Sequence, residues 1–349
     1  MAVLLLPMLM LFTGAQAQDF TYTTNNGTIT ITGYSGSGGV VIIPSTTNGL
    51  PVTSIGDGAF QNKTSLTSVT IPNSVTNIGN SAFLECSGLT NVTIGSGVAS
   101  IGTSAFSSCT SLASATIPDS VTSLGGSAFF DCSGLTSASI GKSVTNLGDD
   151  AFYSCASLAS LTLGSSVTSL ASSVFSYCTS LTSVAIPNSV TSVGDGALSW
   201  CTNLVSVTIP SAVTNIADYA FADCSSLTGV YFRGNAPTVA LSAFDFDSNA
   251  TVYYLPGTTG WGPTFGGLQT VLWNPQVQTS SPTFGVRTNR FGFTITGSSG
   301  LVIVVKACTN LAHPTWVPVG TNTLTGGSSY FSDPQWLNYP ARFYRLSSP

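Results

Sequence analysis

The residues best suited to chemistry are eight cysteines, and seven of them recur at a constant spacing of 23 residues. This column consists of Cys86, Cys109, Cys132, Cys155, Cys178, Cys201 and Cys224. A metal site would need clusters such as C-x-x-C, which this spacing does not provide. Disulfides would suit an exported protein, but seven is an odd number, and parallel neighbouring units suit the required S–S dihedral angle of about 90° poorly. We interpret the column as small, buried apolar side chains.

Acid–base chemistry has few candidates. The one histidine, His313, has no second histidine or reactive cysteine to work with, so it provides no nucleophilic or general-base pair. One column carries carboxylates just before an Ala-Phe pair, at Asp57, Asp149, Asp195 and Asp218. Capping of a short helical turn explains this position, and a weak Ca²⁺ contact or an acid pair is the alternative. We expect no catalytic residue, no metal and no cofactor.

Hydroxyl side chains form two columns that we expect on an outward strand face. The first column is Ser68, Asn91, Ser114, Ser137, Ser160, Ser183 and Ser206. The second is Thr70, Thr93, Thr116, Ser139, Thr162 and Thr208. Such flat rows can dock a protein strand or a glycan, and in some β-solenoids rows of Thr bind ice. The alternative is that Ser and Thr simply suit a solvated sheet face.

Aromatic residues interrupt two columns of the repeat. Tyr177 and Trp200 occupy a mostly polar column that holds Asn62, Glu85, Ser108, Asp131 and Ser154 in the preceding units, and Phe130 and Tyr153 do the same one column over. The repeat does not need to bury these four positions, and exposed aromatics in a row mark binding hot spots or sugar-stacking platforms. Packing of each ring over its own unit is the alternative.

These columns all follow one 23-residue repeat, which reads A-F-x-x-C-x-x-L-x-x-V-x-I-P-x-x-V-x-x-I-G. Its aromatic column runs without a slip from Phe60 to Phe244, with Leu198 as the one aliphatic member. The L-x-x-V-x-I part predicts a strand, ended by Pro or Gly, and A-F-x-x-C predicts one tight helical turn with Phe and Cys on the same side. Each unit then returns to its starting side and stacks on the next at about 4.8 Å.

Composition limits the function. Charged residues make up 6% of the chain, with a net charge of −5, which argues against a nucleic-acid partner. Up to Trp273 the chain has three basic and twelve acidic residues, whereas from Asn274 onward it has five basic and one acidic. Two modules of different character are therefore expected to join near residue 274. The apolar run Val3 to Phe12 is too short to span a bilayer, so we expect no membrane span.

The predicted organisation has six parts. The run Val3 to Phe12 followed by Ala15-Gln16-Ala17 predicts a secretory signal peptide at 1–17. An N-terminal cap at 18–51 contains a hairpin of Ile29-x-Ile31 with Val40 to Ile43, and the repeats occupy 52–245. A C-terminal cap at 246–273 and a linker at 274–282 follow. Short alternating segments then predict a β-sandwich at 283–349.

The phrases "SLTSVTIPNSVTNIGNSAFLECSGLT" (Ser65 to Thr90) and "TSLTSVAIPNSVTSVGDGALSWCTNL" (Thr179 to Leu204) resemble the BspA-type leucine-rich repeat family. The resemblance implies a right-handed curved solenoid of the α/β horseshoe class, secreted or surface-exposed, with a binding role and no catalytic residue. The stretches Leu301 to Val319 and Ala341 to Leu346 are similar to terminal β-sandwich modules of secreted bacterial proteins.

We therefore predict a leucine-rich-repeat solenoid, β-rich with short helical turns, plus a small all-β sandwich. We expect a non-catalytic scaffold, extracellular or on the cell surface, and monomeric. It would bind a protein or glycan through the aromatic row and the hydroxyl columns. A carbohydrate-binding or ice-binding solenoid is the alternative, with a carbohydrate-active enzyme further behind.

Overall fold

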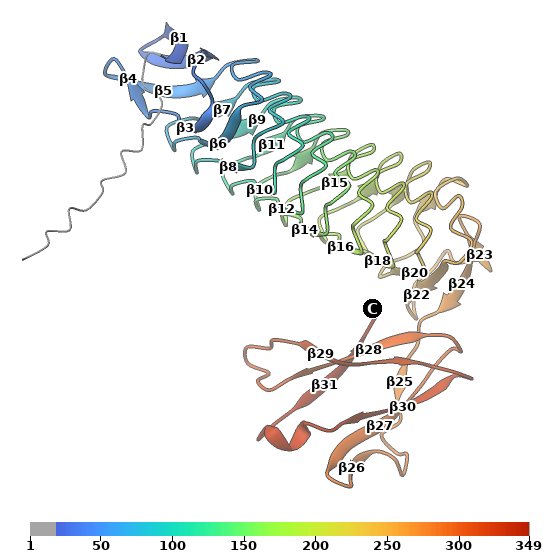
Figure 1. Cartoon of the computed structure of the whole chain (residues 1–349). Helices are drawn as coiled ribbons and strands as arrows, with labels where there is room; N and C mark the ends of the chain where they lie inside the picture. The colour runs from blue at the N-terminus through green and yellow to red at the C-terminus, as the bar shows by residue number, and fades with distance from the viewer. Residues whose placement is uncertain (1–18, 349) are drawn as a thin grey trace, which may run out of the picture.

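The computed structural model describes residues 19–348 and consists of an elongated coil followed by a small sandwich (Figure 1). Each 23-residue unit makes one turn of the coil, and the strand pairing keeps the register of the sequence repeat. Ser114 pairs with Ser137, and Ser137 pairs with Ser160. The predicted leucine-rich-repeat solenoid with a C-terminal β-sandwich is confirmed. The predicted signal peptide at 1–17 lies outside the described residues.

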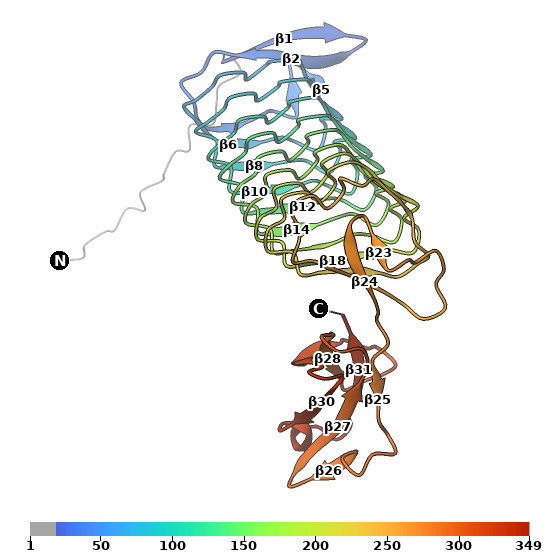
Figure 2. The same cartoon turned by 90° about the vertical axis from the view of Figure 1, so that its right-hand side faces the viewer.

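The L-x-x-V-x-I segments form the first row of parallel strands, as predicted (Figure 2). The row consists of β6 (Leu66–Thr70), β8 (Asn91–Thr93), β10 (Ser114–Thr116), β12 (Ser137–Ser139), β14 (Ser160–Thr162), β16 (Ser183–Ala185), β18 (Ser206–Ile209) and β20 (Gly229–Phe232). Two further parallel strands, β22 (Thr251–Tyr254) and β24 (Leu268–Leu272), extend the row into 246–273, where a cap was expected. The central residue of each short strand points into the coil, and its two neighbours point outward, so the hydroxyl columns lie on the outer face of this row.

A second row of parallel strands, which the sequence did not predict, is formed by the V-x-x-I segments. It consists of β7 (Asn77–Ile78), β9 (Ser100–Ile101), β11 (Ser123–Leu124), β13 (Asn146–Leu147), β15 (Ser169–Leu170), β17 (Ser192–Val193), β19 (Asn215–Ile216) and β21 (Thr238–Val239). Each strand has two residues, one that points outward and one that points into the coil, for example Asn77 and Ile78. Two residues are too few to show the alternation from which strands are predicted.

The third side of the coil, here called the Ala-Phe edge, consists of the turns at 56–63, 79–86 and their equivalents. These segments are hydrogen-bonded turns and not helices. Within one turn, the backbone N–H groups of Leu84 and Cys86 donate to Ser81 and Phe83. The alternate N–H groups, including that of Phe83, donate to the next unit instead. A residue with positive φ lies near each end of the turn, at Ser81 (φ 52°) and Glu85 (φ 59°), which ends any helical run.

The core of the coil is a stack of phenylalanine rings on successive units. Phe60, Phe83 and Phe106 are fully buried, and their ring centroids are 4.8 and 5.0 Å apart. The stack continues to Phe175, is interrupted by Leu198, and resumes between Phe221 and Phe244 at 5.2 Å. Each ring therefore covers the face of the next, so that an isolated unit would leave both faces of its core in water.

The N-terminal end differs from the predicted hairpin. The hairpin forms between β1 (Phe20–Asn25) and β2 (Thr28–Tyr34), and β2 then pairs in parallel with β5 (Leu50–Ile55). The strand β3 (Gly39–Ile42) does not pair with β2 but adds to β6 in the first strand row. The short β4 (Thr46–Thr47) pairs with β5. Residues 29–31 and 40–43 therefore behave as one more irregular turn of the coil, because each continues a different strand row.

The C-terminal sandwich has two antiparallel sheets. One contains β25 (Gln276–Val277), β27 (Arg290–Thr296), β26 (Gly285–Arg287) and β30 (Ser328–Asp333). The other contains β29 (Val317–Thr323), β28 (Val302–Cys308) and β31 (Phe343–Ser347), and a 3₁₀ turn, η2, covers Trp336–Asn338. The strand β25 lies inside the expected linker at 274–282. On the coil, β23 (Thr264–Phe265) pairs with β24.

The sandwich packs beneath the last units of the coil, on the side of the first strand row (Figure 1). Tyr231 on β20 and Tyr253 on β22 are buried in the same hydrophobic cluster as Phe293, Leu301 and other sandwich residues. The two modules thus share an apolar contact in addition to the connecting chain.

Candidate binding surface

Four aromatic side chains that the repeat does not require form one row on the Ala-Phe edge. The ring centroids of Phe130 and Tyr153 are 5.0 Å apart, those of Tyr153 and Tyr177 are 5.3 Å apart, and those of Tyr177 and Trp200 are 5.4 Å apart. Phe130 and Tyr153 are half-buried, whereas Tyr177 and Trp200 are 37% and 41% exposed. The structure therefore brings these four predicted residues together, and we call them the aromatic row.

The backbone conformation of the two most exposed members is unusual. Tyr177 has a φ of 61° and Trp200 a φ of 59°. The equivalent positions in other units hold Asn62, Glu85 and Ser108, which share the left-handed conformation. This conformation costs an L-residue with a Cβ about 1 kcal/mol or more, and bulky side chains adopt it rarely. The fold imposes the conformation on the whole column, so aromatic residues there are not selected by local backbone preference.

Small residues beneath the row make room for these rings. In the two units of Tyr177 and Trp200, the position of Phe130 and Tyr153 is taken by Ser176 and Ser199. Both serines are buried, and their hydroxyl oxygens lie 2.7 Å apart in a hydrogen bond. The rings of Tyr177 and Trp200 thus continue a row that would otherwise end at Tyr153. Local packing and ligand binding, the two interpretations of these aromatics, both fit this contact pattern.

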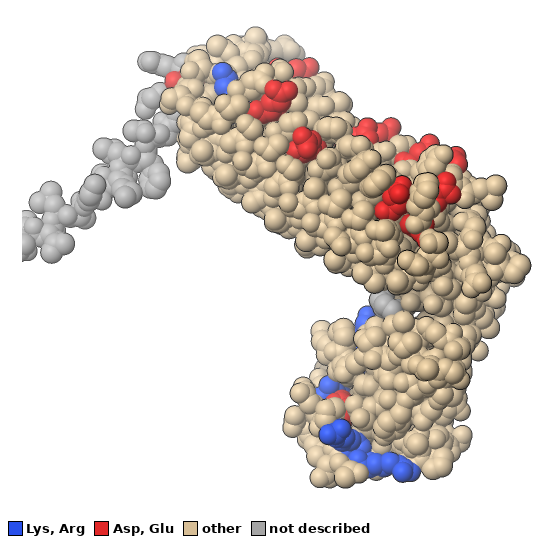
Figure 3. Space-filling view, turned by 45° about the vertical axis from the view of Figure 1, so that its right-hand side comes forward, with Lys and Arg blue, Asp and Glu red and all other residues tan. Residues whose placement is uncertain are grey.

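Carboxylates surround the aromatic row. Ten of the 13 acidic residues of the chain fall in the turns of the Ala-Phe edge, together with a single basic residue, Lys63. Figure 3 shows acidic residues spaced along this edge. Asp131 follows Phe130 directly in the chain, and Asp150 lies close enough to Tyr153 to affect the pKa of its hydroxyl group. Burial raises the pKa of Tyr153, and Tyr177 and Asp150 add to the rise. The edge therefore combines an apolar strip with negative charge.

The aspartate column caps backbone groups, but not those of its own turn. Asp57 accepts a hydrogen bond from the backbone N–H of Asn80, at 2.7 Å, and Asp149 accepts one from Ser172, at 3.0 Å. Both donors lie one unit further along the chain. The predicted capping of a helical turn is thus replaced by capping between units, because no helix forms here. Asp218 instead accepts a hydrogen bond from the side-chain hydroxyl of Ser242 in the following unit.

The hydroxyl columns lie on a separate side of the coil from the aromatic row. Thr93, Thr116 and Thr162 are exposed, whereas Ser68, Thr70 and Thr208 are half-buried. Neighbouring units are linked across this face, as where the Asn91 amide donates to the Ser68 hydroxyl at 3.3 Å. The threonine column is interrupted by Ser139 and by Ala185, and it continues beyond Thr208 as Tyr231 and Tyr253.

All eight cysteines among residues 19–348 are buried free thiols. In the column, each thiol donates to a backbone carbonyl of the preceding unit, as Cys86 does to Phe60 at 3.0 Å. Burial raises the pKa of Cys86 to about 11 and that of Cys155 to about 12. These thiols are therefore protonated at neutral pH and shielded from reagents, which fits their interpretation as core side chains.

Residues 19–348 contain no group of three or more His, Cys, Asp or Glu side chains placed to hold a metal ion. Over the same residues, no helix is both long and apolar enough to cross a membrane.

A hollow lies between the coil and the sandwich, and the sequence did not predict it. Tyr231, Arg233 and Tyr253 line it from the coil, and Lys306 and Arg345 line it from the sandwich. One signal was present, since Tyr231 stands 23 residues after Thr208 and breaks the hydroxyl column with an aromatic residue. The contribution of the sandwich could not be predicted, because nothing in the sequence shows how the two modules pack.

Comparison with known proteins supports the repeat fold. A family model described as the BspA type Leucine rich repeat region matches six copies, over residues 53–182 and 145–259. The T. pallidum leucine rich repeat protein TpLRR is 35% identical, with 55% of this chain and 90% of that chain covered and a TM-score of 0.52. A leucine-rich repeat protein from Bacteroides ovatus is 29% identical, with 73% and 75% covered and a TM-score of 0.55. No curated protein matches this chain.

Proposed function

Because this chain belongs to the BspA-type leucine-rich repeat family, we propose that it is a non-catalytic extracellular scaffold that binds a partner protein through the aromatic row. Leucine-rich repeat proteins generally serve as protein-binding scaffolds, and their stacked units present long surfaces to a partner. The observation that supports this site is the stacking of Tyr177 on Trp200, exposed and in a backbone conformation that aromatic residues rarely adopt.

The geometry favours a protein over a sugar at this edge. A sugar ring stacks on the open face of an aromatic ring. Here the planes of Phe130 and Tyr153 lie 4° apart, as do those of Tyr177 and Trp200, so the rings partly cover each other's faces. Ring edges and exposed flanks then form an apolar strip. Such strips of Tyr, Trp and Phe are typical centres of protein interfaces, where a few residues carry most of the affinity.

The surrounding charges specify the partner further. The carboxylates of Asp131, Asp149, Asp150 and Asp195 lie in the same turns as the aromatic row, and no basic residue falls in those turns. A complementary partner would present an apolar patch with Lys and Arg at its rim. Rim charges of this kind act mainly on the association rate and on salt dependence. The scaffold is proposed to act as a monomer outside the cell or on its surface.

The experiment that tests this proposal is a binding screen of secreted and extracellular-matrix proteins, followed by variants. Tyr177→Asn with Trp200→Asn removes two rings from the row and keeps a residue type suited to positive φ. Phe246→Asn is the matched control, since Phe246 occupies the same column (φ 68°) but is separated from Trp200 by Asp223. A partner should bind the double variant about tenfold or more weakly and the control unchanged. Equal binding to all three proteins would place the interface elsewhere.

A further inference from the structure

We propose that the joint between the coil and the sandwich is a second binding site, built for an acidic sugar residue whose oxyanion is held by Arg233, Lys306 and Arg345. The chemistry is that of a carboxylate or sulfate carried on a saccharide. This site is independent of the aromatic row, which lies on another side of the coil.

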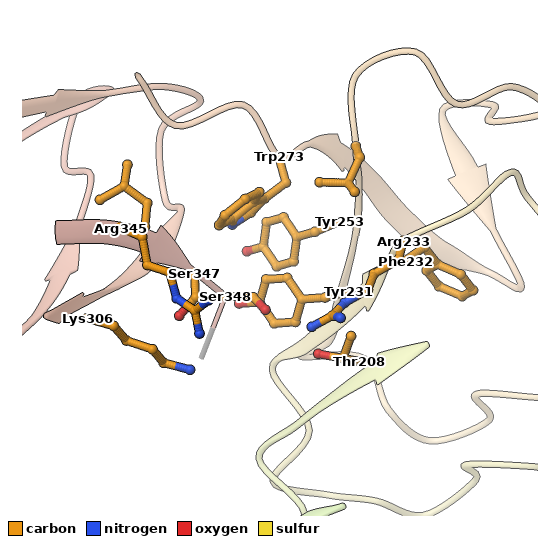
Figure 4. Close-up of a pocket in the computed structure, with 12 residues that line it drawn as sticks. Thr208, Tyr231, Phe232, Arg233, Tyr253, Trp273, Lys306, Arg345, Ser347 and Ser348 are labelled. Carbon is orange, nitrogen blue, oxygen red and sulfur yellow. The ribbon is translucent and has the colours of Figure 1, made fainter. Parts of the chain in front are cut away.

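The joint contains a cavity of about 370 Å³. Its coil side is lined by Thr208, Tyr231, Arg233 and Tyr253, and its sandwich side by Lys306 and Arg345. Figure 4 shows the three basic side chains reaching toward the same space from the two modules, beside the tyrosine hydroxyl groups. A cavity of this volume can hold a small organic ligand such as a sugar residue, and it is larger than a bare inorganic ion requires.

The side chains that line the cavity carry positive charge. None of the lining residues within 19–348 is acidic. Among the described residues, the ion pairs within 4.0 Å are Lys142 with Asp119 and Arg342 with Asp333, so the three basic residues of the cavity take part in none. The chain has eight basic residues, and three of them line this one cavity. An arrangement of this kind binds anions through charge-assisted hydrogen bonds.

Two of these cations are held directly opposite each other. Lys306 on β28 pairs with Arg345 on β31 in the antiparallel ladder, so both side chains lie on the same face of the sheet. Like charges at such positions destabilise a sheet. The guanidinium of Arg345 lies 4.6 Å from the ring centroid of Trp316, which restricts its position. An anion bound between the two side chains would reduce their repulsion, so the pair is better suited to a bound anion than to an empty surface.

The remaining polar groups of the cavity also donate hydrogen bonds. The indole N–H of Trp273 is buried and has no acceptor among the described residues. Burial raises the pKa of the Tyr231 hydroxyl, and Tyr253 adds to the rise, so both phenols stay protonated donors at neutral pH. Every polar side chain that lines the cavity can donate a hydrogen bond, and only its hydroxyl groups can also accept one, so the cavity complements a ligand with several oxygen acceptors.

A saccharide fits the surroundings better than an acidic peptide. A second hollow, of about 430 Å³, shares Thr208 and Arg233 with the cavity and continues along the strand face past Ser183, Asn188 and Ser206. Its polar lining consists of hydroxyl and amide groups, which can both donate and accept, as sugar hydroxyls do. A glycan chain can therefore extend from the cavity along the hydroxyl columns, with its acidic residue at the joint.

The test measures calorimetric binding of defined oligosaccharides to the full chain at low salt. The probes are trigalacturonate for the carboxylate, a heparin-derived tetrasaccharide for the sulfate, maltotriose as the neutral sugar and hexaglutamate as the acidic peptide. The variant is Arg233→Gln with Lys306→Gln, one change in each module. The matched control is Arg287→Gln with Arg290→Gln, which removes the same charge from a cross-strand pair on the far hairpin of the sandwich. Thermal unfolding verifies that both variants are folded.

We expect at least one acidic oligosaccharide to bind, and maltotriose and hexaglutamate to bind at least about tenfold more weakly. The joint variant should lose about tenfold or more in affinity, and the control less than about twofold. Binding of trigalacturonate identifies the carboxylate as sufficient, whereas binding of the heparin tetrasaccharide alone, which carries uronate carboxylates as well, identifies the sulfate as the group required. The proposal is overturned if neither acidic sugar binds, if maltotriose or hexaglutamate binds as tightly, or if both variants weaken binding equally, which would indicate general charge attraction.

Discussion

The ring of Tyr177 lies 5.4 Å from that of Trp200, with the two planes 4° apart, although both residues have φ values near +60°. The stacking is a consequence of the repeat register, because equivalent residues of successive units are neighbours in space. It also compensates part of the backbone cost, since a stacked aromatic pair contributes about 0.5–1.5 kcal/mol.

The first prediction concerns the stability of this pair. Tyr177→Asn with Trp200→Asn should change the free energy of unfolding by no more than about 1 kcal/mol, because lost stacking is offset by relief of the left-handed backbone. Phe246→Asn should stabilise slightly, since that ring is 78% exposed. Urea unfolding measures both effects. A loss of several kcal/mol in the double variant would show that the rings are core packing.

The second prediction concerns the cysteine column. Since burial raises the pKa of Cys86, Cys109 and their equivalents, the thiols should not react with iodoacetamide in the native protein and should all react in denaturant. Mass spectrometry of the alkylated protein counts the modified residues. Fast native labelling of several column cysteines, or disulfides between them, would contradict the packing described here.

The third prediction concerns the joint. A fragment covering 19–273 should retain the fold of the coil, because its contacts are between neighbouring units. It should also associate in solution, since removal of the sandwich exposes Tyr231 and Tyr253, which are 6% and 9% exposed in the full chain. Tyr231→Thr with Tyr253→Thr restores the residue of the hydroxyl column and should make the fragment monodisperse. Light scattering distinguishes the two, and a monodisperse unmodified fragment would show that the exposed tyrosines do not cause association.

The fourth prediction concerns Asp247, a carboxylate that is 2% exposed near the C-terminal end of the coil. Burial raises its pKa to about 8, and Asp223 and Asp245 add to the rise. A carboxyl whose folded pKa is raised contributes its full stability below its unfolded pKa and loses it as pH rises to the folded value. The protein should therefore lose stability between about pH 4 and pH 8. Asp247→Asn should flatten this dependence and raise the melting temperature at pH 8 by a few degrees. An unchanged pH profile would contradict it.

The sequence predicted the coil well because each buried position recurs in register. Phe83, Leu89, Val92 and Ile94 mark one unit, and the next unit repeats them. The same regularity predicted the aromatic row, since equivalent positions on successive units must be neighbours. What it did not predict was the conformation of the Ala-Phe turns. The A-F-x-x-C segment and the aspartate column before it suggest a capped helical turn, whereas residues of these turns such as Ser81 and Glu85 adopt positive φ.

Features that depend on contacts between distant segments were also beyond prediction. The pairing of β3 with β6, instead of with β2, follows from the position of the second strand row, whose two-residue strands leave no periodic signal. The cavity at the joint depends on how the sandwich packs against Tyr231, and the residues of neither module alone describe it.

The strict 23-residue register has a consequence for how the molecule can change in length. Equivalent residues of adjacent units pair directly, as Ser137 does with Ser160, so an in-frame duplication of one unit would insert a complete rung without disturbing those on either side. Each added rung between Trp200 and Tyr231 would move the aromatic row about 4.8 Å further from the joint and leave both sites intact. Duplication of single units within the gene could therefore change the distance between the two proposed binding sites in steps of one strand spacing.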